Sequence, residues 1–515
     1  MFKNENPSAA PGGTNENHQN VDELISTGIA GLDDVLNGGI PRGHFFLLQG
    51  EPGAGKTTLG LQFLIDGTRR GERVLYVTLS ESLREIRKVA RSHHWSLEGV
   101  IIYEFTPTED NLRAEEQYSA FHPSDVEFQD AMQNILDKVE EITPARIVID
   151  SLSEIRLLAR DSLRYRRQIL ALKHYFTNRN CTVLLLDDRT STEHDLQLQS
   201  IAHGVLTLER VHRDYGRTRR RIQIAKMRGS VYREGYHDYT IATGGVEVYP
   251  RLVASEHRRT APDGLASSGH EQLDRLWGGG LDRGTSTLLL GPAGSGKSTV
   301  ALGYAVSAAQ RGEFVSMFLF EELTYLACKR GSGLNIDPTP HMNSGKLHME
   351  QIDPAELSPG EFVQRVRDAV EVRNARVVVI DSLNGFINAM PGELHLPLQM
   401  HELLGFLNQR GVLTLLVLSQ AGLMGANMVT PVDLSYLADN VMLFRYFEAE
   451  GRVRKALSVV KKRSGRHEDT IRELQMKNGC IEIGDALTSF RGVLTGVPNY
   501  VGPLHPPSER DAAYR

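Results

Sequence analysis

The feature that most constrains this chain is a glycine-rich pattern that occurs twice. Residues 50–58 read GEPGAGKTT and residues 291–299 read GPAGSGKST. Both match G-x-x-x-x-G-K-[ST], in which the backbone wraps phosphates, the lysine reaches the β- and γ-phosphates, and the hydroxyl binds Mg²⁺. A chance glycine turn is the alternative. It is excluded by two copies that each follow an apolar run and precede a helical pattern.

The two loops therefore predict two sites for ATP and Mg²⁺. The residues expected to contact the nucleotide are Gly50, Gly53, Gly55, Lys56, Thr57 and Thr58 in the first loop, and Gly291, Gly294, Gly296, Lys297, Ser298 and Thr299 in the second.

The duplication extends beyond the loops. A shift of 241 positions places RRGERVLYVTLSE (69–81) on QRGEFVSMFLFEE (310–322), and RIVIDSLSEI (146–155) matches VVVIDSLNGF (377–386) after a small drift. This pattern indicates a tandem duplication rather than a short-period repeat. We expect a disordered tail (1–20), a first domain (21–250), a linker (251–267), a second domain (268–495) and an extended C-terminal tail (496–515).

Each half alternates apolar runs with helical patterns. In the first half, strands are predicted at 44–50, 73–80, 146–150, 182–188 and 204–211, with helices at 56–71 and 82–95. Continuous apolar runs are typical of strands that are buried on both faces of a parallel sheet. Later paired runs in each half predict antiparallel ribbons at the sheet edge. The fold class is therefore α/β, a mainly parallel sheet flanked by helices, present twice.

Acidic residues follow two of the predicted strands in each half. Asp150 and Asp381 end the strands RIVID and VVVID, where a carboxylate reaches the Mg²⁺ shell together with Thr57 and Ser298. The alternative is that each aspartate caps the next helix.

After the second strand the first half has Ser80 and Glu81, and the second half has Glu321 and Glu322. A carboxylate here can orient or deprotonate a nucleophile. Acidic residues also favour a helix start through the helix dipole, which is the alternative.

Composition narrows the class of protein. The net charge of −6 provides no overall positive field for nucleic acid or an anionic membrane. The longest apolar runs fall short of the ~20 residues of a membrane-spanning helix. The three cysteines have no metal-ligand spacing and are interpreted as reduced thiols of a cytoplasmic protein.

The constellation resembles the KaiC family, clock ATPases of the RecA superfamily. The loops alone indicate only a RecA-like domain. The tandem order, the paired glutamates, and the stretches KMRGS (226–230) and KKRSG (461–465) make the resemblance specific, and it extends from Leu24 to Pro498. It implies ATPase and serine/threonine autokinase activity, and a double-ring homohexamer with ATP between subunits. It also implies a small KaiB-like regulatory partner.

The resemblance also implies roles for residues. Lys226, Arg228, Lys461 and Arg463 would reach the neighbouring subunit's nucleotide; the alternative is a solvated basic strand end. Three residues match or lie near the family's phosphorylated pair: Ser435, Tyr436 and Thr430. There are two departures, Ser80 in place of a glutamate and Tyr436 in place of a threonine. Two other classes of function stay open, a DNA-handling RecA-type motor and a scaffold that ATP assembles without phosphate transfer.

Overall fold

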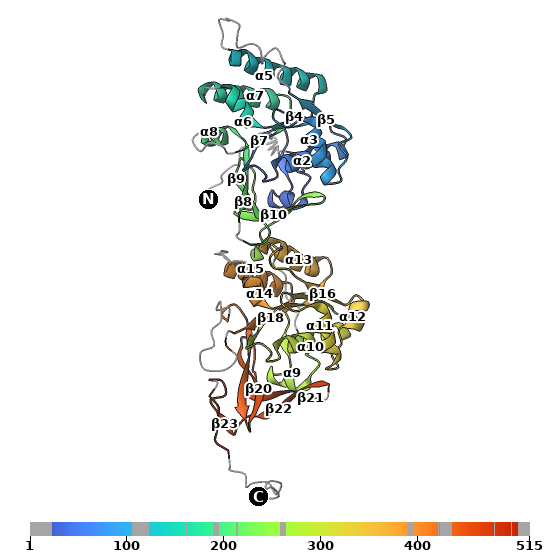
Figure 1. Cartoon of the computed structure of the whole chain (residues 1–515), viewed down its shortest axis with the longest axis vertical. Helices are drawn as coiled ribbons and strands as arrows, with labels where there is room; N and C mark the ends of the chain where they lie inside the picture. The colour runs from blue at the N-terminus through green and yellow to red at the C-terminus, as the bar shows by residue number, and fades with distance from the viewer. Residues whose placement is uncertain are drawn as a thin grey trace, which may run out of the picture. The chain divides into compact units, whose positions relative to one another are not determined.

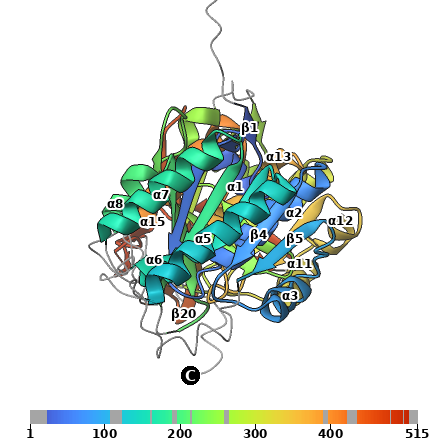
Figure 2. The ribbon, with the colours of Figure 1, turned by 90° about the horizontal axis from the view of Figure 1, so that it is seen from above.

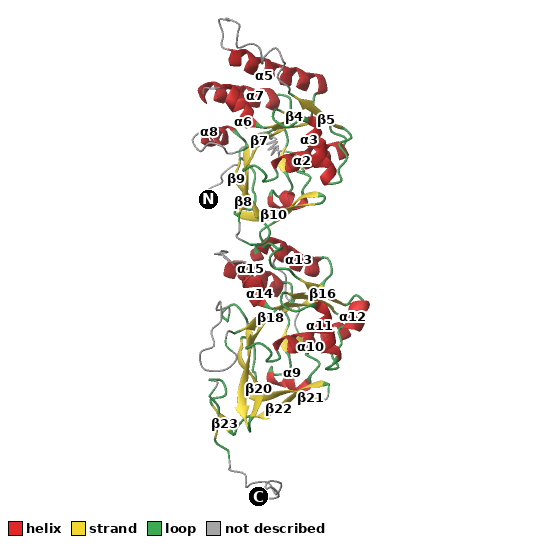
Figure 3. Cartoon of the chain, viewed as in Figure 1, coloured by secondary structure: helices red, strands yellow, loops and turns green. Residues whose placement is uncertain are grey.

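The structure is a computed structural model of the chain. It describes residues 23–105, 123–159, 162–188, 195–212, 215–257, 264–388, 396–420, 422, 435–477, 479–495 and 497–502. Within this part of the chain each repeat forms a nine-stranded sheet with helices packed on it (Figures 1 and 3). The predicted duplicated α/β fold is confirmed.

The first repeat begins with a small β1–β2 ribbon and continues into alternating strands and helices. Its elements are β1 (Leu24–Ile25), α1 (Ala30–Val35), β2 (Ile40–Pro41), β3 (Phe45–Gly50), α2 (Lys56–Arg69), β4 (Val74–Thr78), α3 (Leu83–Ser92), β5 (Val100–Glu104), α5 (Pro123–Ile142), β6 (Arg146–Asp150), α6 (Leu152–Ala159), α7 (Ser162–Thr177), β7 (Thr182–Asp187), α8 (Asp195–Ile201), β8 (Gly204–Val211), β9 (Arg219–Met227), β10 (Tyr236–Ala242) and β11 (Gly245–Tyr249).

The second repeat runs through a similar order, but it adds α12 and the β23–β24 ribbon, and its described residues include no helix that corresponds to α8. After the turn η2 (Ala254–His257) come β12 (Leu265–Ala266), α9 (Glu271–Leu276), β13 (Leu281–Asp282), β14 (Ser286–Gly291), α10 (Lys297–Gln310), β15 (Phe314–Leu319), α11 (Thr324–Ser332), α12 (Thr339–Asn343), β16 (Leu347–Gln351), α13 (Pro359–Glu371), β17 (Ala375–Asp381), α14 (Leu383–Asn388), α15 (Leu396–Gln409), β18 (Leu413–Ser419), β19 (Asn440–Ala449), β20 (Arg452–Lys462), β21 (Arg472–Lys477), β22 (Cys480–Ala486), β23 (Phe490–Arg491) and β24 (Asn499–Tyr500).

The sheets explain where a ligand can bind. The first has the strand order β11-β10-β9-β8-β3-β7-β6-β4-β5 and the second β16-β15-β17-β18-β14-β19-β20-β21-β22. The central strands pair in parallel, for example β3 with β7 and β14 with β18, while β19 to β22 form an antiparallel ribbon. The carboxyl ends of parallel strands meet at one edge, so both phosphate loops and both strand-end aspartates lie on that edge of their own sheet.

Helices cover both faces of each sheet. In the first repeat, apolar residues of α5, α6 and α7 share a buried cluster with β3, β4, β6 and β7, and α2 contacts β4, β6 and β7. The ribbons of α2, α5, α6 and α7 are seen from above in Figure 2. In the second repeat α9 and α10 belong to one buried cluster, and α13, α14 and α15 belong to another. None of the described helices is long and apolar enough to cross a membrane.

The chain divides into two compact units. The first contains residues 1–209, 222–236 and 240–248, and the second contains 210–221, 237–239 and 249–515. The short segments 210–221 and 237–239 therefore belong, by their contacts, to the second unit. The proposed domain and linker bounds stay predictions.

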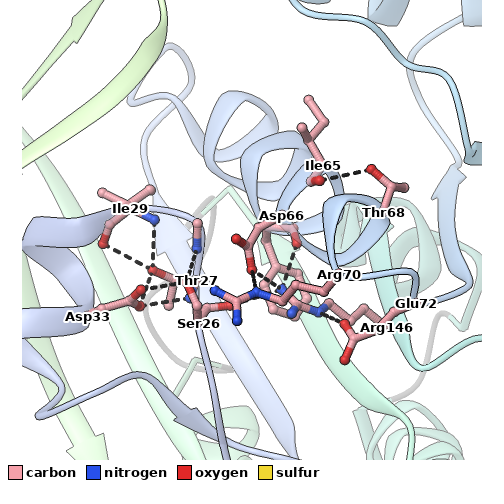
Figure 4. A network of polar contacts seen from close by, with 12 residues as sticks. Ser26, Thr27, Ile29, Asp33, Ile65, Asp66, Thr68, Arg70, Glu72 and Arg146 are labelled. Carbon is pink, nitrogen blue, oxygen red and sulfur yellow. Dashed lines mark hydrogen bonds and ion pairs between the residues drawn. The ribbon is translucent and has the colours of Figure 1, made fainter.

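A buried arginine distinguishes the first repeat. Arg146 is fully buried at the start of β6 and forms ion pairs with Glu72 and with Asp66, at 3.2 Å for the latter. It also donates to the carbonyl oxygens of Ser26 and Phe63 (Figure 4). Because a buried guanidinium needs compensating charge, this network joins β6, α2 and the N-terminal segment.

Candidate active site

The first phosphate loop has the geometry that the motif predicts. It joins β3 to α2. Gly53 and Gly55 have left-handed φ values of 77° and 98°, a conformation that would be strained for a residue with a side chain. Lys56 is buried, and its Nζ donates to the carbonyl oxygens of Gly50 (2.7 Å) and Glu51 (3.1 Å). The loop is therefore closed around the lysine that is expected to meet phosphate.

An acidic residue that sequence reasoning missed contacts this lysine. Asp188, directly after β7, lies 2.6 Å from Lys56 Nζ through Oδ1. The signal was present in the sequence, because two aspartates end the apolar run TVLLLDD. The Asp188 carboxylate thus forms an ion pair with the ammonium group that we expect to contact a nucleotide phosphate.

Asp150 lies in the predicted place beside the loop hydroxyl. Thr57 Oγ1 donates to Asp150 Oδ2 at 3.0 Å, and the phenol of Tyr76 donates to the same oxygen at 2.5 Å. Burial raises the pKa of Asp150, and these two hydrogen bonds oppose that rise. Sequence reasoning missed Tyr76, because a tyrosine within a buried strand carries no motif signal.

Glu81 points into the same site. Its Oε2 is buried and has no hydrogen-bond partner in the described part of the chain. Its backbone N–H is bonded to Thr78 Oγ1 at 3.0 Å, which fixes the turn after β4. Burial, followed by the charge of Asp150, raises the pKa of Glu81, so the carboxylate is a stronger base. Ser80 is exposed.

The second phosphate loop repeats the backbone but differs in charge. Gly294 and Gly296 have φ values of 74° and 111°, and Lys297 Nζ donates to the carbonyl oxygen of Pro292 at 2.7 Å. Burial lowers the pKa of Lys297 to about 8. Gln49 and Leu290 are equivalent positions of the two repeats, and they pair with Asp187 and Leu418 in the neighbouring strands. The residues that follow, Asp188 and Ser419, are therefore equivalent as well. Serine offers no carboxylate to the lysine.

Asp381 completes the second site. Burial raises its pKa to about 6, opposed by a hydrogen bond from Ser298. Its Oδ2 is buried without a hydrogen-bond partner among the described residues. A hard divalent cation prefers such oxygen ligands, so Ser298 with Asp381, and Thr57 with Asp150, fit the Mg²⁺ that the motif implies. Thr58 and Thr299 are buried at the start of α2 and α10.

The two glutamates after β15 differ from each other. Glu321 is exposed, whereas Glu322 is half-buried and pairs with Arg330 Nη2 at 2.9 Å. The matching position of α3 in the first repeat is Val89, so Glu81 has no such arginine. Arg330 was not predicted, since nothing in its local sequence marks it.

The basic signatures contact backbone carbonyls within the chain. Lys226 Nζ donates to the carbonyl oxygens of Gln199 and Ala202 at the end of α8, at 2.5 and 2.8 Å, and Arg228 Nη2 donates to that of Ser200 at 2.7 Å. A cation at a helix C-terminus is favourable. The proposed role of both residues at a neighbour's nucleotide stays a prediction.

The second signature makes comparable contacts. Lys461 Nζ donates to the carbonyl oxygens of Ser435 (2.9 Å) and Ala438 (2.7 Å). Arg463 pairs with Asp439 at 2.9 Å, yet its side chain is 63% exposed. Ser435 is half-buried and Tyr436 is 60% exposed, while Thr430 lies outside the described residues.

Comparisons with known proteins agree with this geometry. A family model described as "ATPase: KaiC" matches residues 25–253 and again residues 266–488. The chain belongs to the KaiC family. Circadian clock protein KaiC3 of Synechocystis sp. is 26% identical over 93% of this chain and 95% of its own length. The circadian clock oscillator protein KaiC of Thermostichus vulcanus is 25% identical over 93% and 92%. The protein is thus a divergent KaiC-like member that binds ATP.

Proposed function

We propose that the protein is a cytoplasmic, ATP-driven signalling hexamer, in which the first lobe hydrolyses ATP and the second phosphorylates a serine of the chain. Here a lobe is one repeat with its phosphate loop. One observation carries the proposal. Both lobes have a buried loop lysine, a loop hydroxyl beside a strand-end aspartate, and a glutamate after the strand that follows the loop helix (β4 or β15). ATP supplies the γ-phosphoryl group and Mg²⁺ the charge that neutralises its oxygens.

In the first lobe Glu81 is the base. Its buried, unpartnered oxygen can accept the proton of an attacking water, and its raised pKa improves proton transfer near neutral pH. Lys56 leaves Asp188 to contact the phosphates. With serine at position 80, the lobe works with one glutamate rather than two.

In the second lobe the acceptor is Ser435 of a neighbouring subunit. Its Oγ forms the bond to the γ-phosphorus, the bond from that phosphorus to the β–γ bridging oxygen breaks, ADP leaves, and the serine proton goes to Glu321. Glu322, held by Arg330, orients the site. Tyr436 is longer than a serine and would overshoot a site shaped for a short hydroxyl, so it is little used; Thr430 is a minor acceptor.

The hexamer follows from the basic signatures. Lys226, Arg228, Lys461 and Arg463 would leave the partners that they have within the chain and reach the nucleotide of the next subunit. Cations supplied in trans contribute roughly 10³–10⁵ in rate in related phosphoryl-transfer enzymes. A small KaiB-like protein is the proposed partner of the first ring.

Assembly tests the ring. Mass photometry with and without Mg-ATP should show hexamers that depend on nucleotide, and Lys56→Ala should reduce them more than Lys297→Ala. Equal hexamer content in Lys56→Ala and wild type would contradict an assembly role of the first lobe.

Phosphopeptide mapping tests the kinase. After incubation with labelled ATP, we expect label on Ser435 in wild type and its loss in Glu321→Gln and Lys297→Ala. Ser435→Ala should remove the main site while ATP hydrolysis continues. Hydrolysis with no label anywhere in wild type would leave an ATPase without kinase activity.

A further inference from the structure

A cavity of about 190 Å³ lies in the second lobe beside α10 and the edge ribbon β21–β22. Residues that line it include Ser268, Val300, Gly303, Ser307, Ile336 and Ile481. It extends along α10 from the turn that follows Lys297 to the C-terminal end of the helix. The cavity is therefore separate from the strand-end edge that carries Asp381.

The first lobe shows what normally fills this space. The 241-residue shift holds here, because His94 and Asn335 both have left-handed φ values, of 58° and 56°. The next residues, Trp95 and Ile336, donate their N–H groups to Ala90 and Gly331, also 241 apart. Trp95 thus corresponds to Ile336, and Gln62 on α2 corresponds to Gly303 on α10.

In the first lobe these two side chains bind the edge ribbon. Gln62 Nε2 donates to the carbonyl oxygen of Val246 at 3.2 Å, and Val246 N donates to Gln62 Oε1 at 2.7 Å. Trp95 Nε1 donates to the carbonyl oxygen of Gly244 at 3.2 Å. A primary amide and a planar ring thus occupy the place of the cavity.

In the second lobe both groups are missing. A Cβ on Gly303 would meet only Ile481 Cδ1, 3.9 Å away, although a glycine inside a helix is destabilising relative to alanine. Ile336 is much smaller than an indole. The cavity is the volume that these two replacements leave open.

The edge strand β22 presents the same backbone groups to it. Ile481 occupies the place of Val246, two residues after the turn glycines Gly479 and Gly244. Ile483 N donates to Gln272 Oε1 at 3.1 Å, away from β21. Because backbone direction alternates along a strand, Ile481 turns its N–H and C=O the same way, toward the cavity that it lines.

We propose that this cavity is a small-molecule site for a planar ring that carries a carboxamide or cyclic amide. The amide would pair with the N–H and C=O of Ile481, as Gln62 pairs with Val246. The ring would lie where Trp95 lies in the first lobe. An apolar cavity of about 150 Å³ holds benzene, so this one has room for a single substituted ring. Occupancy would brace α10, whose first residue is Lys297.

Nicotinamide is a suitable probe, because it is a single ring with a primary carboxamide. Saturation-transfer NMR on the full chain, with saturating Mg-ATP present, should show saturable binding. Methyl nicotinate, which lacks the amide N–H, should bind at least tenfold more weakly. Gly303→Gln, which copies the first lobe, should weaken nicotinamide binding at least tenfold, and Ile336→Trp should do the same if Gly303→Gln does not fold.

Val372→Gln is the matched control, since it adds the same side chain at an exposed site outside the cavity lining, and it should bind nicotinamide like wild type. Four results would overturn the proposal: no binding to wild type with or without Mg-ATP, equal binding in both filled variants, equal binding of methyl nicotinate, or binding that is seen only when Mg-ATP is left out. The last would place the probe in the nucleotide site. None of these results depends on kinase or ATPase activity.

Discussion

The two lobes share a backbone but differ in how they hold charge. In the first, Lys56 faces Asp188, and Asp150 receives hydrogen bonds from Thr57 and Tyr76. In the second, burial lowers the pKa of Lys297 to about 8 and raises that of Asp381 to about 6. In the first site the loop lysine is paired with a carboxylate, whereas in the second burial shifts the pKa values of both the loop lysine and the strand-end aspartate.

This difference agrees with the proposed division of labour between the lobes. A site that is already compensated binds nucleotide by exchanging partners, which suits a structural and slowly hydrolysing role. A site in which one buried carboxylate oxygen has no hydrogen-bond partner among the described residues gains more from Mg²⁺ and phosphate, because each neutralises a desolvated charge. The lobes also differ in charge away from the nucleotide. The first lobe has the ion pair of Asp66 and Arg146, whereas the corresponding residues of the second lobe, Ser307 and Val377, are uncharged.

The largest expected effect tests the buried ion pair of Arg146 and Asp66. Arg146→Val should destabilise the first lobe by about 3–5 kcal/mol, because it removes the buried cation that Asp66 and Glu72 share and leaves only Arg70 and Arg42 to pair with them. Hydrogen-exchange mass spectrometry of β6 and α2 measures it, with the second lobe as an internal reference.

The double variant Asp66→Ser/Arg146→Val copies the second lobe and should recover part of the loss. Exchange in Arg146→Val that matches wild type would mean that the arginine is dispensable.

The next effect is on hydrolysis in the first lobe. In a Lys297→Ala background, Glu81→Gln should lower ATP turnover by about 10²–10⁴, the usual contribution of a general base. Phosphate release at saturating Mg-ATP measures it, and Ser80→Glu in the same background should raise the rate. Unchanged turnover in Glu81→Gln would mean that the residue only begins the turn before α3.

Much of this was predictable from sequence, for reasons that particular residues show. Lys56, Thr57 and Asp150 lie close together because backbone-dictated motifs fix them, and the apolar runs predicted β3, β4, β6, β7 and β8. The edge strands β5 and β16 were not predicted. Asp188 and Arg330 were missed because their roles depend on which strands and helices become neighbours. The cavity at Gly303 was invisible for a related reason, since it arises from two side chains that α10 and the segment after α11 lack where they face the ribbon.

A smaller effect concerns pH. In a Lys56→Ala background, ATP bound to the second lobe requires a charged Lys297, whose pKa in the protein is about 8. Below that pH the ammonium is present; above it, binding must take up a proton, so affinity should fall by up to about tenfold per pH unit. Calorimetry between pH 7 and 9.5 in buffers of different ionisation heat measures affinity and proton uptake (roughly zero to one proton). A flat profile would show that the lysine stays charged.

The smallest effect tests the ion pair between Lys56 and Asp188, by which the first phosphate loop differs from the second. Asp188→Asn removes a negative charge that competes with phosphate for Lys56, at 2.6 Å from its Nζ. We expect ATP to bind the first lobe several-fold more tightly, in the order of 1 kcal/mol, because the half-buried carboxylate is partly screened by solvent. The reciprocal variant Ser419→Asp should weaken binding to the second lobe by a similar factor. Fluorescent-nucleotide titrations in Lys297→Ala and Lys56→Ala backgrounds separate the two sites. If Asp188→Asn instead weakens binding, the carboxylate holds the lysine in place for the phosphate rather than competing with it, and the contrast between the lobes would rest on Asp150 and Asp381 alone.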